Sequence, residues 1–233
     1  MAMHDEIKEQ TLKFKDMSLK KKAGYIWDYY KWWIIGGIIF IIAAFSFISQ
    51  WRISSRPVYL QAYFLNSNLI YDPDSTIMQD YIDMYNIDTD AYNLYIDTGS
   101  YIDPDGYDQV SMGNQMKLMA SYYAGDIDVL AGPKILIDGY ANADAYADLM
   151  EILPESLIEE LDAKGYETYT CKNEDGRSFI AGIYLDNCSY LKEQGEGGVY
   201  PESSSDDERP VFTIAANSQN QDHAIELLEM LIK

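Results

Sequence analysis

The sequence predicts an α/β protein: a layered α/β/α domain with a largely parallel or mixed sheet, preceded by a single transmembrane helix. Three observations lead to this prediction. Residues 32–51 form an apolar run without a charge, and the segment after them alternates between strand-like and helix-like patterns. That segment, residues 58–233, is also long enough to bury one hydrophobic core.

The uncharged run is long enough to cross a membrane. It holds twenty consecutive residues, from Trp32 to Trp51. At about 1.5 Å per residue, a helix of that length spans roughly 30 Å of hydrocarbon. Aromatic residues crowd both ends, as at the two interfaces of a bilayer. The run is longer than the apolar part of a cleaved signal peptide, and it is apolar on every face, unlike a core helix. We therefore expect an uncleaved signal-anchor at residues 32–51.

Lysines set the expected orientation in the cell membrane. Seven lysines precede the run, whereas Arg52 and Arg56 follow it. By the positive-inside rule, residues 1–31 form a cytoplasmic head and residues 58–233 an extracellular domain. Residues 52–57 are the expected linker, and so short a linker would keep the domain at the membrane surface.

Charge separates these parts and excludes one class of function. The head carries seven lysines and five acidic residues, a net charge of +2. The other 10 of the 17 basic and 33 of the 38 acidic residues follow residue 31, which gives the remainder a net charge of −23. Nucleic acid and anionic lipid repel such a domain. A nucleic-acid-binding role is therefore excluded.

The first half of the domain begins with a buried strand. Residues 58–65 are almost continuously apolar, which is typical of a strand covered on both faces. Apolar residues then recur at helical spacing before an alternating segment. The expected elements are a strand at 58–65, a helix around 77–85, a strand at 92–96 and a longer helix with Met112, Met116, Met119 and Tyr123 on one face.

In the second half, glycines mark the helix ends. Gly125 and Gly165 stand where two helical patterns stop. Ser218 and Gln221 have the spacing of a capping box before the last helix. Residues 195–210 have the composition of a loop. The expected elements are a strand at 127–131, helices at 141–149 and 155–164, a hairpin of 166–171 and 179–185, a strand at 211–216 and a helix at 219–232.

Cysteine and histidine offer little for catalysis. Cys171 and Cys188 are either bridged or free buried thiols, and the sequence leaves both open. His223 on the last helix is either solvent-facing or a catalytic base, but no Ser-His-Asp or Cys-His arrangement can be assembled around it. Zinc would need several His or Cys ligands. We expect a protein that is not an enzyme and uses no cofactor.

Several segments together resemble a known family. They are residues 124–130 (AGDIDVL), 147–149 (ADL) with 153–154 (LP), 214–220 (IAANSQN) and 223–228 (HAIELL). These segments are similar to extracellular solute-binding proteins of bacterial uptake transporters, a periplasmic-binding-protein-like family. Residues 25–32 (YIWDYYKW) resemble the anchor region of uncharacterised clostridial membrane proteins.

The resemblance implies a fold and a role. Members of that family have two lobes and close on ligand between them, whereas this domain is about half their size and looks like one lobe or a strongly shortened two-lobe relative. The resemblance therefore implies a non-catalytic domain that binds a small solute or a partner at the membrane surface. The alternative is an interaction module or accessory subunit of an envelope or transport complex, which has kept the fold and lost the ligand cleft.

A solute site would lie at the carboxyl ends of the parallel strands, as open α/β sheets favour. The residues that follow the first three predicted strands are the candidates for it: Asn66, Ser67, Asp97, Thr98, Gly132 and Pro133.

Two further features have both a functional and a structural interpretation. Asp103 and Asp105 are calcium candidates in one loop, but placing Gly106 at the sixth position of a calcium loop puts no acid at its first or twelfth position, which favours a solvated turn.

Tyrosine is abundant, and core packing would explain Tyr81, Tyr85, Tyr92 and Tyr123, which fall at core-facing spacing. The tyrosines near predicted loops are candidates for ligand recognition: Tyr101, Tyr107, Tyr140 and Tyr200.

Overall fold

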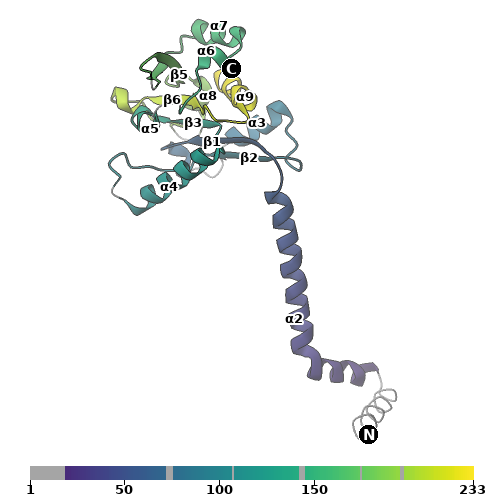
Figure 1. The fold of residues 1–233 in the computed structure, drawn as a ribbon. Coiled ribbons are helices and arrows are strands. Elements are labelled where there is room, and N and C mark those ends of the chain that lie inside the picture. The colour runs from purple at the N-terminus through teal and green to yellow at the C-terminus, as the bar shows by residue number, and fades with distance from the viewer. Residues whose placement is uncertain (1–18, 72–75, 107, 142–144, 174, 195–196) are drawn as a thin grey trace. The chain divides into compact units, whose positions relative to one another are not determined.

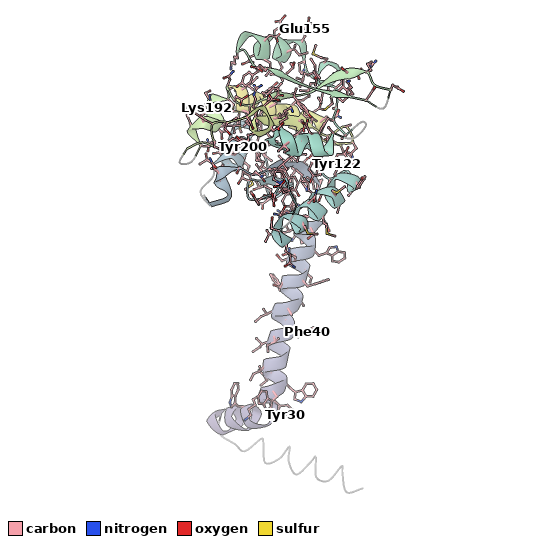
Figure 2. The ribbon with its side chains drawn as sticks, turned by 90° about the vertical axis from the view of Figure 1, so that its left-hand side faces the viewer. Tyr30, Phe40, Tyr122, Glu155, Lys192 and Tyr200 are labelled. Carbon is pink, nitrogen blue, oxygen red and sulfur yellow. The ribbon has the colours of Figure 1, made fainter. Side chains whose placement is uncertain are left out.

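The computed structural model describes residues 19–71, 76–106, 108–141, 145–173, 175–194 and 197–233. The chain divides into two compact units after Ser55. The first described element is one long helix, α2 (Leu19–Ser54). Within it, Tyr30–Ser54 is long and apolar enough to cross a membrane. Figure 2 shows Tyr30 and Phe40 projecting from this helix.

The helix is longer than the expected span at residues 32–51. Its first turns belong to the segment that we expected as a separate head, and residues 52–54 of the expected linker are helical as well. The uncharged run has no helix-capping signal at either end. The helix can therefore continue into the charged residues on both sides of the run.

The second unit confirms the α/β prediction with a mixed sheet (Figure 1). Within the described residues, six strands form one sheet in the order β2-β1-β3-β6-β5-β4. β1 pairs in parallel with β2 and β3, whereas β6 is antiparallel to β3 and β5. The strands are β1 (Val58–Phe64), β2 (Asn93–Asp97), β3 (Val129–Pro133), β4 (Thr168–Lys172), β5 (Ser178–Tyr184) and β6 (Pro210–Ile214).

Helices cover both faces of the sheet, which gives the expected α/β/α layers. Alternate side chains of β1 point to opposite faces: Phe64 joins the core under one helical layer and Tyr63 the core under the other. The first layer contains α3 (Ile77–Tyr85), α6 (Leu149–Ile152), α7 (Glu155–Ala163), α8 (Ser189–Glu193) and α9 (Gln221–Ile232); the second contains α4 (Gln109–Ala124) and α5 (Lys134–Tyr140). Two short 3₁₀ turns, η1 (Asn68–Tyr71) and η2 (Asp206–Glu208), complete the fold.

The strand directions bring the carboxyl ends of four strands to one edge of the sheet. β5 and β3 are each antiparallel to β6, so β5 runs in the same direction as β1, β2 and β3. The carboxyl ends of these four strands therefore share one edge with the first residues of β6. Open α/β sheets bind ligands at such an edge.

Two segments that carry the family resemblance meet in the structure. The Asp128 carboxylate is buried and accepts hydrogen bonds from the Ser218 hydroxyl (2.6 Å) and the Gln61 backbone N–H (2.8 Å). Asn220 Nδ2 lies 3.3 Å from both carboxylate oxygens. Asp128 thus fixes the chain before α9 to the start of β3.

Three local predictions were wrong. In the described part of the expected helix at 141–149, only Leu149 is helical, as the first residue of α6; Tyr146 instead forms an isolated bridge with Ala215, and its hydroxyl donates to the Ile137 carbonyl. The structure has a helix just before it, α5, that the sequence analysis missed. The capping box also fails, because the Ser218 hydroxyl is bonded to Asp128, and the N-cap residue of α9 is Asn220, which makes no side-chain cap bond.

Candidate functional site

The predicted ligand residues after β1 and β2 lie close together. However, the side chains of Asn66 and Ser67, which follow β1, form hydrogen bonds with the segment after β2. The Asn66 amide donates to the Ile102 carbonyl (2.8 Å) and accepts from the Ile102 N–H (2.7 Å). The Ser67 hydroxyl, which is buried, donates to the Thr98 carbonyl (2.7 Å). We name this set of contacts between residues 66–69 and 97–102 the loop clasp.

The Asp97 side chain is bonded within the second of these two segments. Its carboxylate accepts from the Gly99 N–H (2.9 Å) and from the Ser100 hydroxyl (3.0 Å). Lys117 of α4 lies 3.5 Å from the same carboxylate. An Asp side chain that bonds its own backbone two residues later is typical of a turn.

The two candidates after β3 are closely packed. A Cβ atom on Gly132 would lie 2.9 Å from Leu65 Cβ and 3.2 Å from the Leu65 carbonyl oxygen, so only glycine fits there without a shift. Pro133 pairs with Pro210 of β6 and immediately precedes α5. Neither residue lines the cavity described next.

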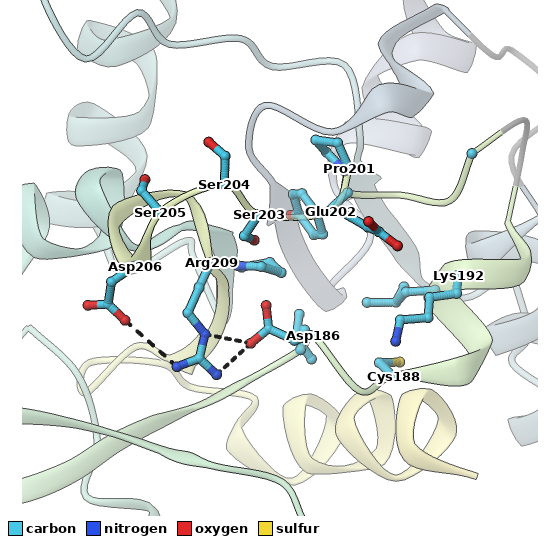
Figure 3. Close-up of a pocket in the computed structure, with 15 residues that line it drawn as sticks. Asp186, Cys188, Lys192, Pro201, Glu202, Ser203, Ser204, Ser205, Asp206 and Arg209 are labelled. Carbon is cyan, nitrogen blue, oxygen red and sulfur yellow. Dashed lines mark hydrogen bonds and ion pairs between the residues drawn. The ribbon is translucent and has the colours of Figure 1, made fainter.

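A cavity of about 830 Å³ opens farther along the same sheet edge, beyond the end of β5 (Figure 3). One wall is the segment after β5 together with α8, and the other is the loop before β6. The lining residues are Leu185, Asp186, Cys188, Leu191, Lys192, Gly197, Tyr200–Ser205, Asp206, Arg209 and Pro210. The sequence analysis identified this loop and named Tyr200 as a recognition candidate, but it did not place a site here.

Glycines and one valine shape the loop wall. Gly197 and Gly198 have positive φ angles of 94° and 79°, which glycine adopts without strain. They bring Val199 into the core, where its N–H donates to the Leu191 carbonyl of α8 (2.8 Å) and its own carbonyl accepts from the Asn68 N–H (2.8 Å). The loop is thereby held against α8 on one side and the end of β1 on the other.

Two hydroxyl groups at the cavity have no hydrogen-bond partner among the described residues. Tyr200 Oη and Ser203 Oγ are shielded from solvent, and neither forms a hydrogen bond with any of the described residues. Both residues line the cavity. Burial raises the pKa of Tyr200, so its hydroxyl stays protonated and can donate. Shielded polar atoms without a partner are rare in folded proteins, because each costs about 1–3 kcal/mol.

Arg209, one of the two cations at the cavity, is engaged by carboxylates. Arg209 Nε and Nη2 bond the Asp186 carboxylate at 2.8 Å and 2.6 Å, and Nη1 bonds Glu167 at 3.0 Å. Figure 3 shows the guanidinium between Asp186 and Asp206, and its carbon lies 3.8 Å from the Tyr184 ring centroid. Burial lowers the pKa of Arg209, but the bonds to these carboxylates outweigh it and the net shift is upward.

Cys188 lines the cavity without reactive character. It is fully buried, and its thiol contacts the Leu231 carbonyl oxygen at 3.0 Å. Burial raises the pKa of this thiol, which keeps it in the protonated, poorly nucleophilic form. Cys171 is the other cysteine, and both are free buried thiols.

His223 is half-buried, which corrects the solvent-facing prediction. Its ring stacks on Tyr59 with centroids 3.6 Å apart, and Nδ1 lies 2.7 Å from the Tyr59 carbonyl oxygen. The Tyr59 hydroxyl donates to Glu226 (3.0 Å), and burial together with Glu226 raises the pKa of Tyr59 to about 12. His223 therefore packs α9 onto β1 and lines no part of the cavity.

The calcium candidates lie in a turn. The Asp103 carboxylate accepts from the Asp105 N–H (3.1 Å), while Asp108 caps α4 through the Ser111 N–H (2.8 Å). In the described part of the chain, no group of three or more His, Cys, Asp or Glu side chains could hold a metal ion.

The other tyrosine candidates have different outcomes. Tyr101 is exposed, Tyr140 has a shielded hydroxyl on α5, and Tyr107 lies outside the described residues. Two tyrosines that we expected in the core are exposed instead: Tyr92 by 40% and Tyr123 by 77%.

Comparison with known proteins found no match: no family model, curated protein or solved structure matches the chain.

Proposed function

We propose that this chain is a membrane-anchored binding protein, and that its α/β domain takes a small, uncharged, hydroxylated solute in the cavity beside α8. The proposal follows the resemblance to solute-binding proteins. It is supported by the contact between two of the segments that carry this resemblance, through Asp128. The cavity also lies at the edge where open α/β sheets bind ligands.

The observation that carries the proposal is the pair of unpartnered hydroxyls. Tyr200 Oη and Ser203 Oγ are withdrawn from solvent without a bond to the described residues. When the Tyr200 and Ser203 side chains turn toward the cavity, a ligand with hydroxyl groups can accept from and donate to both, which removes the cost of leaving them unpaired. A site with unpaired hydroxyls also discriminates strongly against an analogue of the ligand that lacks the group to which these hydroxyls would bond.

Charge and size narrow the ligand class. Three carboxylates and two cations line the cavity, and Arg209 is already held by Asp186. In a domain with so large an excess of acids, an anionic ligand is disfavoured. The volume falls within the usual range for small-molecule sites. Leu185, Leu191 and Pro201 supply apolar surface of the kind that packs against the face of a sugar ring. A monosaccharide or disaccharide fits these conditions.

Under this proposal the domain lies outside the cell, and the lysines that precede the apolar helix support this orientation. Protease added to intact cells should then remove the domain. Full protection of the domain in intact cells, with digestion after lysis, would reverse the orientation.

Ligand binding is tested by calorimetry on the full chain in lipid nanodiscs, with a panel of neutral mono- and disaccharides. At least one sugar should bind the wild type. Tyr200→Phe and Ser203→Ala should each weaken that binding by about tenfold or more, because each removes one hydrogen bond to the ligand. Tyr140→Phe is the matched control, since it also deletes a shielded tyrosine hydroxyl, but on α5 outside the cavity.

Three results would contradict the proposal. The first is a panel in which no sugar binds. The second is binding that Tyr200→Phe and Ser203→Ala leave unchanged. The third is an equal loss in Tyr140→Phe, which would indicate a general change in the domain.

A further inference from the structure

The outer face of α4 carries an exposed apolar stripe. Met112, Met116, Met119 and Tyr123 follow one another at spacings of four, three and four residues, so they lie on one side of the helix. They are exposed by 52%, 72%, 40% and 77%. Ser111 and Leu118 are the buried residues of this helix and face the sheet instead. We name the four exposed residues the α4 stripe.

The helix is also unusual in its charge. Its sequence contains no acidic residue, although the chain after residue 31 has 33 of them. Its single charged residue, Lys117, is exposed, and its amine lies beside the stripe, 3.5 Å from Asp97 and over the Tyr63 ring. The outer face of α4 therefore offers uncharged, flexible methionine side chains, which adapt to an apolar partner surface.

Acidic residues stand at both ends of the stripe. Asp103, Asp105 and Asp108 precede the helix, and Asp126 follows it. Asp105 and Asp126 are exposed, and Asp103 and Asp108 are partly exposed. An apolar stripe between two acidic ends is complementary to an amphipathic helix that carries apolar residues in its middle and lysine or arginine at its ends.

We infer that the α4 stripe docks a basic amphipathic helix of a partner protein. This inference is independent of the cavity and of any solute. A second copy of the chain would bring the acidic ends of two α4 helices together, whether the helices met parallel or antiparallel, and like charges would oppose it. A bilayer surface that contains anionic lipids would repel the same acidic ends.

The probe is a synthetic peptide of roughly 18 residues, about five helical turns, with leucine along one face and lysine at both ends. A matched peptide has the same leucines and glutamate in place of lysine. Fluorescence anisotropy measures their binding to the full chain, both in detergent micelles and in nanodiscs of neutral lipid. The basic peptide should bind at least about tenfold more tightly than the acidic one, and added salt should reduce the difference.

Two variants test whether the basic peptide binds at the α4 stripe. Met116→Gln and Met119→Gln keep helix propensity but remove apolar surface, so each should weaken peptide binding by about tenfold if it lies near the centre of the interface. Met150→Gln is the matched control: Met150 is exposed by 53% on α6, outside the stripe. It should leave peptide binding unchanged, and all three variants should keep the thermal stability of the wild type.

If the α4 stripe binds something other than a basic helix, these measurements give different results, and each of those results would overturn the inference. Equal binding of both peptides, or no effect of Met116→Gln and Met119→Gln, would rule out a basic helix on this face. Dimers of the wild type that the two variants abolish would assign the stripe to a second copy. Peptide binding in micelles that is lost in nanodiscs would assign it to the bilayer surface.

Discussion

Two parts of one sheet edge differ in how they use their polar side chains. The loop clasp, after β1 and β2, holds the candidates that the sequence analysis favoured, and the amide and hydroxyl groups of Asn66 and Ser67 are bonded within the protein. The cavity, after β5, contains two hydroxyls that have no partner in the part of the chain that the structure describes. Polar residue types occur in both places. Unused hydrogen-bonding capacity distinguishes the cavity.

The difference has a physical basis. A polar group that is bonded inside the protein gains little by exchanging its partner for a ligand, because one hydrogen bond replaces another. A shielded group without a partner gains the full bond. The loop clasp should therefore act on stability, and the cavity hydroxyls on ligand binding.

The largest expected effect is at Asn66, which has a φ angle of 53° in addition to its two side-chain bonds to Ile102. Asn66→Gly removes both bonds and should lower the free energy of unfolding by about 2 kcal/mol. Asn66→Ala adds the strain of a left-handed backbone and should lower it by about 3 kcal/mol. Chemical denaturation of the full chain measures both.

The sugar affinity of both Asn66 variants should remain that of the wild type, when measured where they are folded. An Asn66 variant that keeps its stability but no longer binds the sugar would place the ligand site in the loop clasp. That result would contradict the contrast between the loop clasp and the cavity.

A somewhat smaller effect is expected at Gly132. The added methyl group of Gly132→Ala would press on Leu65 and should lower the free energy of unfolding by about 2 kcal/mol. Gly139→Ala, seven residues later in α5, is the control, because no atom lies within 4 Å of its added Cβ. It should gain up to about 1 kcal/mol from helix propensity. A neutral Gly132→Ala would show that this end of β3 is looser than its contacts indicate.

Strong local patterns predicted most of the fold. The apolar run at 58–65 became β1, and the glycines at 125 and 165 end helices with φ angles of 74° and 73°. The failures lie where tertiary contacts override local preference. Residues 145–148 have helical composition, yet Tyr146 bonds to the chain at Ala215 and Ile137 instead. The helix α5 has only seven residues, too few for a clear period.

The site was less predictable than the fold. The sequence placed Asn66, Ser67, Asp97 and Thr98 near one another correctly, because the carboxyl ends of parallel strands share an edge. It could not show that Asn66 would be paired with Ile102, 36 residues away. Nor could it show that Tyr200 and Ser203 would be left unpaired, since that depends on distances set by the whole loop.

The smallest effect on stability, with the opposite sign, is expected at the cavity. Because the Tyr200 hydroxyl has no partner among the described residues, Tyr200→Phe should leave the free energy of unfolding at neutral pH unchanged or raise it by up to about 1 kcal/mol. A loss of more than about 1 kcal/mol would reveal a structural bond at that hydroxyl and would remove the contrast with the loop clasp.

Alkaline pH sharpens this last test. Burial raises the pKa of Tyr200 above its ordinary value near 10, so above about pH 10 the unfolded chain loses this proton first. The wild type then binds more protons when folded, and its stability falls as the pH rises. Tyr200→Phe lacks that contribution, whereas the other tyrosines contribute equally to both proteins. The stability gained by Tyr200→Phe should therefore grow above about pH 10; a constant difference would mean that the Tyr200 hydroxyl is exposed to solvent.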